Sequence, residues 1–191
     1  MFNINIQRLL KDYENVNFST NNSYSQSYPY FIDYFESLGY IEKKHLIIWG
    51  HFVYGWMPTV LSLNWEHINQ VLQYVNAAKN WYILQEKELE IMKKCINNSM
   101  VWASKLLHFI NPQDYAIWDS RIYRYTDWKS TSYGINKTKL YAEYVQELKM
   151  VSQSKDGLHL YKEISKRIPY KITPLRAFEL LMFESDKQWT K

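Results

Sequence analysis

The sequence predicts an all-α fold, a compact arrangement of roughly nine or ten helices. Apolar residues recur every three or four positions along most of the 191 residues. No segment alternates apolar and polar residues convincingly over the length of a strand. Capping residues, prolines and glycines separate the periodic segments. This length suits one domain, residues 1–191, or two closely packed lobes at about 1–96 and 97–191.

The composition is that of a globular protein, with 47% hydrophobic and 22% charged residues. The longest apolar runs, such as Leu46–Trp49, are far too short for a transmembrane helix. The first residues, Met1–Ile6, show no basic region followed by a long apolar core, so we expect no signal peptide. A single cysteine, Cys95, excludes an internal disulfide. These features indicate a cytoplasmic protein without a membrane partner.

The charge and the aromatic content are compatible with nucleic-acid binding. The net charge is +4, with 17 Tyr and 8 Trp in the chain. Aromatic side chains stack on bases, and a basic protein is attracted to phosphates. An AT-rich genome is an alternative explanation, because it also favours codons for Tyr, Asn, Lys and Ile.

Five helices are expected in the chain before the central region. Helices are predicted at Ile4–Tyr13, Phe31–Leu38 and Glu42–Tyr54, with a polar loop at Glu14–Tyr30. Gly39 suits the end of the second helix, and Gly55–Pro58 breaks the third. Asn64 is an expected N-cap for the next helix, which buries Ile68, Val71 and Val75, and a further helix is predicted over Trp81–Ile96.

Three helices are expected in the last third. After a polar loop at Thr126–Ile135, Asn136 is placed to cap an amphipathic helix that ends near Val151. Ser152–Asp156 links it to a helix at Gly157–Arg167. Thr173 and Pro174 then supply an N-cap and a first-turn proline for the last helix.

The central region, Asn97–Tyr125, organises the chain. An apolar helix ends at Asn111-Pro112, because proline lacks an amide hydrogen and disfavours helical geometry in the residue before it. Tyr115–Trp118 is an apolar crossing that suits a core. Asp119 follows at the expected N-cap of a helix over Ser120–Tyr125, where its carboxylate accepts a backbone N–H.

This region resembles the active-site region of the helix-hairpin-helix DNA glycosylases, and among them the small 8-oxoguanine-glycosylase-like proteins. The likeness continues more faintly in Thr173–Leu180. It implies a helix-hairpin-helix core in which the turn Asn97–Trp102 binds a DNA phosphate. Lys105 then corresponds to the family's lysine after the turn, and Asp119 to the aspartate that a proline-containing loop delivers.

Two features depart from the family's pattern. The turn has no glycine, although Asn97 and Asn98 tolerate positive φ. Lys105 and Asp119 are 14 residues apart, closer than in the family by roughly a turn and a half of helix. Either the helix is shortened with Lys105 still facing the pocket, or only the aspartate function remains.

The resemblance implies a DNA N-glycosylase that flips a damaged or modified base out of the duplex and acts at the anomeric carbon. Oxidised guanine, or a bulky modified base as in phage DNA, is the expected substrate. Asp119 would stabilise positive charge on the sugar ring. Lys105 would be the nucleophile, giving a Schiff base and strand cleavage by lyase chemistry.

Further site residues are expected around this pair. The base pocket would be lined by Trp49, Trp102, Trp118 and Phe178, with Trp56 as another aromatic in reach, and DNA contacts would come from Ser99, Val101, Ser104, Arg121, Arg124 and Lys129. No His or Cys spacing indicates a metal, and no nucleotide-binding motif is present, so no cofactor is expected. The expected partner is double-stranded DNA, bound by a monomer.

Simpler interpretations stay open for the same residues. Asp119 can be only an N-cap, and Lys105 only a solvent-exposed residue at a helix start. Arg121 is placed to pair with a carboxylate such as Asp119 or Glu179 rather than with DNA, and His108 is typical of a hydrogen-bonded core histidine. The alternative function is a non-catalytic helical module that binds DNA or a protein in a bacterial defence or toxin system.

Overall fold

The computed structural model describes residues 4–56, 62–127 and 134–189, and confirms the all-α fold within them. This part of the chain contains ten α-helices and one 3-10 helix, with no strand beyond an isolated bridge between Leu63 and Ile96. The helices are α1 (Ile6–Asn15), α2 (Ser23–Ser37), α3 (Lys43–Trp56), η1 (Trp65–His67), α4 (Ile68–Lys79), α5 (Glu86–Cys95), α6 (Met100–Ile110), α7 (Ser120–Asp127), α8 (Thr138–Gln153), α9 (Lys155–Arg167) and α10 (Pro174–Trp189).

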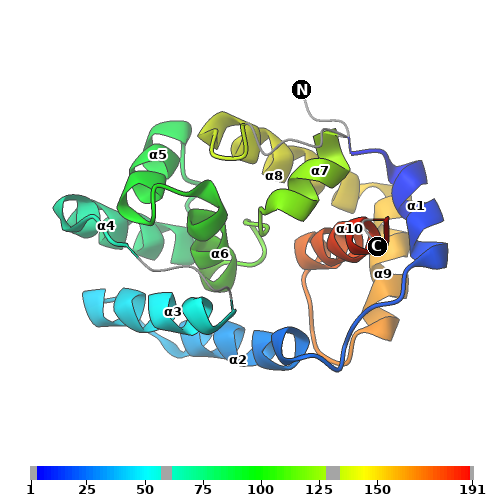
Figure 1. Cartoon of the computed structure of the whole chain (residues 1–191), viewed down its shortest axis with the longest axis horizontal. Coiled ribbons are helices and arrows are strands. Elements are labelled where there is room, and N and C mark those ends of the chain that lie inside the picture. The colour runs from blue at the N-terminus through cyan, green and yellow to red at the C-terminus, as the bar shows by residue number, and fades with distance from the viewer. Residues whose placement is uncertain (1–3, 57–61, 128–133, 190–191) are drawn as a thin grey trace.

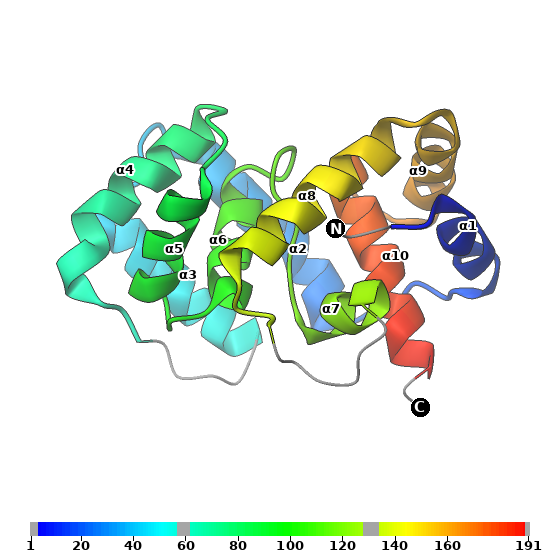
Figure 2. The same ribbon diagram turned by 90° about the horizontal axis from the view of Figure 1, so that it is seen from above.

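Helices from the two ends of the chain lie together. Helix α1 packs against α9 and α10 on one side of the molecule, while α3, α4 and α5 lie on the other (Figure 1). Helix α6 lies between these groups and contacts α2, α4 and α5. Seen from above, α8 crosses the molecule over α6 and α10 (Figure 2). Helix α10, the last helix of the chain, packs against α7, α8, α9 and α1. It therefore connects the central region with the first helix.

The loop expected over Glu14–Tyr30 is wrong, because α2 begins at Ser23 and continues through Pro29. A proline inside a helix costs about 3 kcal/mol. Asn22 offsets part of this cost, since its side chain accepts the Ser25 amide at 2.9 Å as an N-cap. Burial of Tyr28 and Phe35, each 1% exposed, contributes the rest. Tertiary packing therefore overrides the local signal.

The helix expected over Trp81–Ile96 is shorter than predicted. Trp81 has a φ of 67°, in the left-handed region, and α5 begins only at Glu86. The Glu88 carboxylate accepts the Gln85 amide at 2.7 Å, which fixes this later start.

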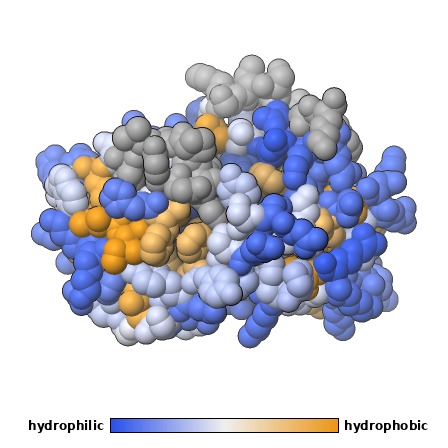
Figure 3. Space-filling model, turned by 60° about the horizontal axis from the view of Figure 1, so that its bottom comes forward, coloured by the Kyte–Doolittle hydropathy of each residue, from blue (hydrophilic) through white to orange (hydrophobic). Residues whose placement is uncertain are grey.

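Aromatic side chains make up much of the core. Trp49, Trp118, Tyr28, Tyr141, Tyr144, Phe35, Phe109 and Phe178 are among the largest fully buried side chains. Some apolar surface is left over α3, where Ile48 and Phe52 are 39% and 46% exposed (Figure 3). Among the described residues, no helix combines the length and the apolarity that a membrane crossing requires.

Candidate functional site

Helices α5 and α6 form a hairpin with a tight turn. Asn97 and Asn98 have φ values of 54° and 46°, as expected for a turn that uses asparagine where glycine is usual. The turn is tied to the segment before η1. The Asn97 amide donates to the Ser62 carbonyl at 2.9 Å, and the Ser62 amide donates to Asn97 Oδ1 at 2.7 Å. The first turn of α6 is therefore held at a defined place.

The cap of α6 comes from a distant residue. Ser99 is the N-cap by position, but its side chain makes no capping bond. Instead, Asn136 Oδ1 accepts the Met100 amide at 3.1 Å. Asn136 was expected to cap α8, and this expectation is wrong, since α8 begins after Lys137. The reason is tertiary: the segment before α8 passes the start of α6.

Ser104 brings the two predicted catalytic residues together. Its hydroxyl accepts the Trp118 amide at 3.0 Å and lies 2.9 Å from the Val101 carbonyl. Lys105 follows Ser104 on α6, and Asp119 follows Trp118 at the start of α7. Lys105 and Asp119 are fewer residues apart than the family's pattern implies. The hydrogen bond between their neighbours, Ser104 and Trp118, compensates for this short separation.

Asp119 caps α7 as predicted. Its Oδ1 accepts the amides of Arg121 and Ile122 at 2.9 and 3.0 Å. The residue is half-buried. These two bonds fix the orientation of the carboxylate, whose charge acts on the Lys105 amine.

Lys105 is 4% exposed, so it is not the solvent-exposed residue of the simpler interpretation. Burial lowers the pKa of its amine to about 8, against the opposing attraction of the Asp119 and Glu179 carboxylates. The Arg176 guanidinium lowers it further. The neutral form of the amine, which can act as a nucleophile, is therefore populated just above neutral pH.

Two further charged residues, Arg176 and Glu179, complete the cluster, and sequence reasoning did not assign them to the site. They form an ion pair one turn apart on α10 and are 7% and 2% exposed. Burial raises the pKa of Glu179 to about 7, and the Asp119 charge adds to this while Arg176 opposes it. The available signal was an Arg and a Glu at i and i+3 on the apolar face of the last helix. We call Lys105, Asp119, Arg176 and Glu179 the charge cluster.

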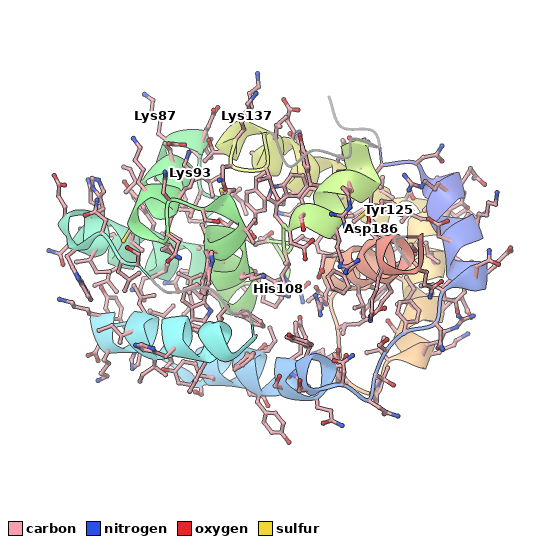
Figure 4. The ribbon with its side chains drawn as sticks, viewed as in Figure 1. Lys87, Lys93, His108, Tyr125, Lys137 and Asp186 are labelled. Carbon is pink, nitrogen blue, oxygen red and sulfur yellow. The ribbon has the colours of Figure 1, made fainter. Side chains whose placement is uncertain are left out.

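Uncharged side chains from α2 and α6 lie against the charge cluster. The Arg176 guanidinium carbon lies 4.5 Å from the centroid of the Tyr28 ring. Tyr28 Oη is 2.9 Å from His108 Nε2, and His108 Nδ1 is 2.8 Å from the Tyr115 carbonyl. His108, near the centre of the molecule (Figure 4), is a hydrogen-bonded core histidine. Burial lowers its pKa to about 3, so it is neutral near pH 7.

The four aromatic residues expected in the base pocket are all in the core, each at most 3% exposed. The rings of Trp49 and Trp102 meet edge to face with centroids 6.0 Å apart. Trp118 packs against Tyr144 and donates from Nε1 to the Ile135 carbonyl at 2.8 Å. Phe178 is fully buried on α10, one residue before Glu179.

The residues expected to contact DNA lie in different settings. Ser99 and Val101 are half-buried at the start of α6, whereas Ser104 is buried completely. Arg121 and Arg124 both pair with Asp186 on α10, with N–O distances of 3.3 and 2.6 Å. The Arg121 guanidinium therefore pairs with a carboxylate, as the simpler interpretation expects, and one such partner is Asp186. Lys129 lies outside the described residues.

A cavity of about 540 Å³ lies between α2, the ends of α4 and α6, and the link before α10. Tyr28, Trp81, Asn111 and Tyr170 are among its lining residues, and Lys105 and Asp119 are not. Within residues 4–56, 62–127 and 134–189, no three His, Cys, Asp or Glu side chains converge as a metal site requires.

Comparisons with protein-family models, with curated proteins and with solved structures find no match to this chain. The charge cluster and the hairpin between α5 and α6 are therefore the features of this chain that bear on its function.

Proposed function

We propose that this protein is a DNA N-glycosylase of the helix-hairpin-helix type, with Lys105 as nucleophile and Asp119 as the essential carboxylate. One observation carries the proposal: a buried amine with a pKa of about 8 lies in one cluster with a carboxylate fixed by a helix cap. Buried lysines are rare because desolvation of the charged form is costly. Strongly shifted pKa values cluster at functional sites, although structural ion-pair networks also produce them.

The chemistry follows from these two groups. As the bond between C1′ and the base stretches, positive charge grows on the sugar, and the Asp119 carboxylate stabilises it. The Lys105 amine attacks C1′, the base leaves with the bonding electrons and takes up a proton, and a C–N bond to the lysine replaces the glycosidic bond. Opening of the sugar ring gives a Schiff base, from which the DNA strand can be cleaved.

DNA is proposed to approach the start of α6. The amides of a helix N-terminus hold a phosphate well, and this end of α6 is set by the hairpin turn. Because Lys105 is only 4% exposed, a flipped nucleotide reaches it only after side chains over the amine have moved. We propose oxidised guanine or a bulky modified base, as in phage DNA, as the substrate.

Borohydride trapping tests this function. Duplexes that carry unmodified, oxidised or hypermodified bases are incubated with the protein and reduced. Wild type should form a covalent adduct that Lys105→Ala loses and that Lys93→Ala, which changes a lysine paired with Glu90 on α5, retains. Asp119→Asn keeps an N-capping side chain and should abolish base release. Base release without trapping would mean that Asp119 acts and Lys105 does not.

The alternative is a non-catalytic helical module of a defence or toxin system, and the closed surface over Lys105 favours it. It predicts salt-dependent binding to duplex DNA, or binding to a protein, without release of any base. The same assay separates the two functions, because Lys105→Ala would then leave binding unchanged and no base would be released by either protein.

A further inference from the structure

Trp81, at the edge of the cavity beside α2, adopts a backbone conformation that suits glycine. It follows the end of α4 with a φ of 67°. The Trp81 amide donates to the Ala78 carbonyl at 3.1 Å, and the Tyr82 amide donates to the Ala77 carbonyl at 3.0 Å. These are the hydrogen bonds of a helix end that usually has glycine at this position. A bulky side chain is strained there.

The Trp81 side chain is placed at the cavity rather than in the core. Trp81 is 66% exposed, so burial does not offset its strain. Strained residues that packing does not explain cluster at ligand sites. The cavity volume, about 540 Å³, is in the usual range for a small-molecule site. Its walls include Tyr28 and Tyr170, with ring centroids 5.4 Å apart, and the rings of Pro29 and Pro112.

The charged groups around the cavity favour a cation. Asp33 and Glu36 both line it from α2 and are three residues apart, so one ligand can reach both carboxylates. Two lysines oppose them: Lys79, whose ammonium donates to the Phe35 carbonyl at 2.7 Å, and Lys171 on the link before α10. The carboxyl ends of α4 and α6 also lie at the cavity, and each is equivalent to about half a negative charge. The lining therefore has an excess of about one negative charge.

We infer that this cavity binds a small organic cation with an apolar body. Its ammonium group meets the carboxylates of Asp33 and Glu36, and its apolar body packs against the Trp81 indole. Aromatic rings also attract the positive charge itself, because the face of a ring is electronegative. Neither Lys105 nor Asp119 lines the cavity, so the inference does not depend on the glycosylase proposal.

Fluorine NMR tests the site with 2-phenylethylamine, which is a cation at pH 7. The tryptophans are replaced by 5-fluorotryptophan, and the signals of Trp81 and Trp65 are identified by their absence from Trp81→Phe and Trp65→Phe. The amine should shift the Trp81 signal to saturation, with a dissociation constant of about 1 mM or lower, as is ordinary for so small a ligand.

Trp65 is the internal control. It is 50% exposed but does not line the cavity, and the Lys43 ammonium lies 4.3 Å from its ring centroid. The amine should leave the Trp65 signal in place. The absence of a saturable shift at Trp81, or an equal shift at Trp65, would overturn the inference.

Two other ligands with a phenyl group separate the effect of charge from that of packing. 2-Phenylethanol is neutral and phenylacetate is an anion. Both should bind about 10-fold more weakly than the amine, or worse, because neither gains from the carboxylates on α2. If either ligand binds as tightly as the amine, the cavity does not select a cation and the inference is wrong.

The double variant Asp33→Asn, Glu36→Gln removes both carboxylate charges and keeps the size of the side chains. Both residues are exposed, so the variant should fold. It should bind the amine about 10-fold more weakly and change the binding of 2-phenylethanol by less than about twofold. Glu42→Gln, which removes an exposed carboxylate outside the cavity, is the control and should leave binding unchanged. Equal amine binding by the double variant and the control would contradict the assigned role of α2.

Trp81→Gly tests whether the strained residue serves the ligand or the fold. Glycine adopts this φ without strain, so the midpoint of urea unfolding should rise. Amine binding, measured by calorimetry, should weaken by about fivefold or more because the indole surface is lost. A lower midpoint would mean that the indole stabilises the fold, and unchanged binding would mean that it does not contact the ligand. Either result would count against the inference.

Discussion

Replacing Lys105 by Met should stabilise the folded protein at pH 7 by about 3 kcal/mol. Methionine has nearly the length of lysine and carries no charge, so it fills the same space without the cost of burying an ammonium. The pKa of Lys105 falls from 10.5 to about 8, and each unit corresponds to 1.36 kcal/mol of stability. The product is about 3 kcal/mol, which is a large part of the stability of a domain of this size.

The sign and the pH range follow from proton binding. Between pH 8 and pH 10.5 the unfolded chain binds more protons at Lys105 than the folded chain, so the stability of wild type rises with pH. Below pH 8 the full cost is present. The advantage of Lys105→Met should therefore be constant at neutral pH and shrink toward zero by pH 10.5.

Urea unfolding followed by tryptophan fluorescence measures this difference at pH 7, 9 and 10.5. The titration of groups that do not interact with Lys105 cancels between the two proteins. Lys44→Met, at a side chain that is 63% exposed, is the control and should show no pH-dependent difference from wild type. An advantage of Lys105→Met that stayed the same from pH 7 to pH 10.5 would refute the account of the buried amine.

Substitutions at three other positions, Ser104, Asn136 and Asp186, test the parts that hold the site. Ser104→Ala leaves the buried Trp118 amide without its acceptor and should destabilise the protein by about 1–3 kcal/mol in urea unfolding, whereas Ser165→Ala, which loses only a bond within α9, should cost under about 0.5 kcal/mol. Asn136→Ala removes the cap of α6 and should cost about 1 kcal/mol. Asn136→Asp should keep that stability and weaken duplex binding, because its charge repels a phosphate at the same helix end; unchanged binding would place the DNA elsewhere. Asp186→Asn releases two arginine side chains and should strengthen duplex binding and steepen its dependence on salt, as measured by fluorescence anisotropy; the same slope as wild type would exclude these arginines from the interface.

Local chemistry made several features of the site predictable. Asn111-Pro112 ends α6, Asp119 caps α7, and Thr173 caps α10 with its hydroxyl accepting the Arg176 amide at 3.2 Å. Each of these signals depends on residues within four positions, so the sequence alone contains it. The same holds for Asn97 and Asn98, whose positive φ follows from the asparagine side chain.

The features that sequence reasoning missed depend on distant partners. Helix α2 continues past Pro29 because Tyr28 meets His108 in the core. Asn136 caps α6, although it stands beside α8 in the sequence. Glu179 has Arg176 as a local partner, but its relation to Lys105 arises only when α10 packs against α7. In each case a contact between residues far apart in the sequence determines the local structure. The residue pattern within one helix contains no sign of that contact.

The charge cluster raises the question of why this fold keeps ionisable groups in its interior. Four ionisable groups in an apolar interior cost stability, and apolar residues of similar volume often serve a core as well or better. The surrounding structure nevertheless holds each group in place: a cap for Asp119, an ion pair for Glu179, and the bond between Ser104 and Trp118 for the spacing of Lys105. A chain selected for stability alone would have little use for this arrangement, because proteins generally retain destabilising buried charges where function requires them. The proposed chemistry of the Lys105 amine and the Asp119 carboxylate would give the cluster a role that its contribution to folding does not supply.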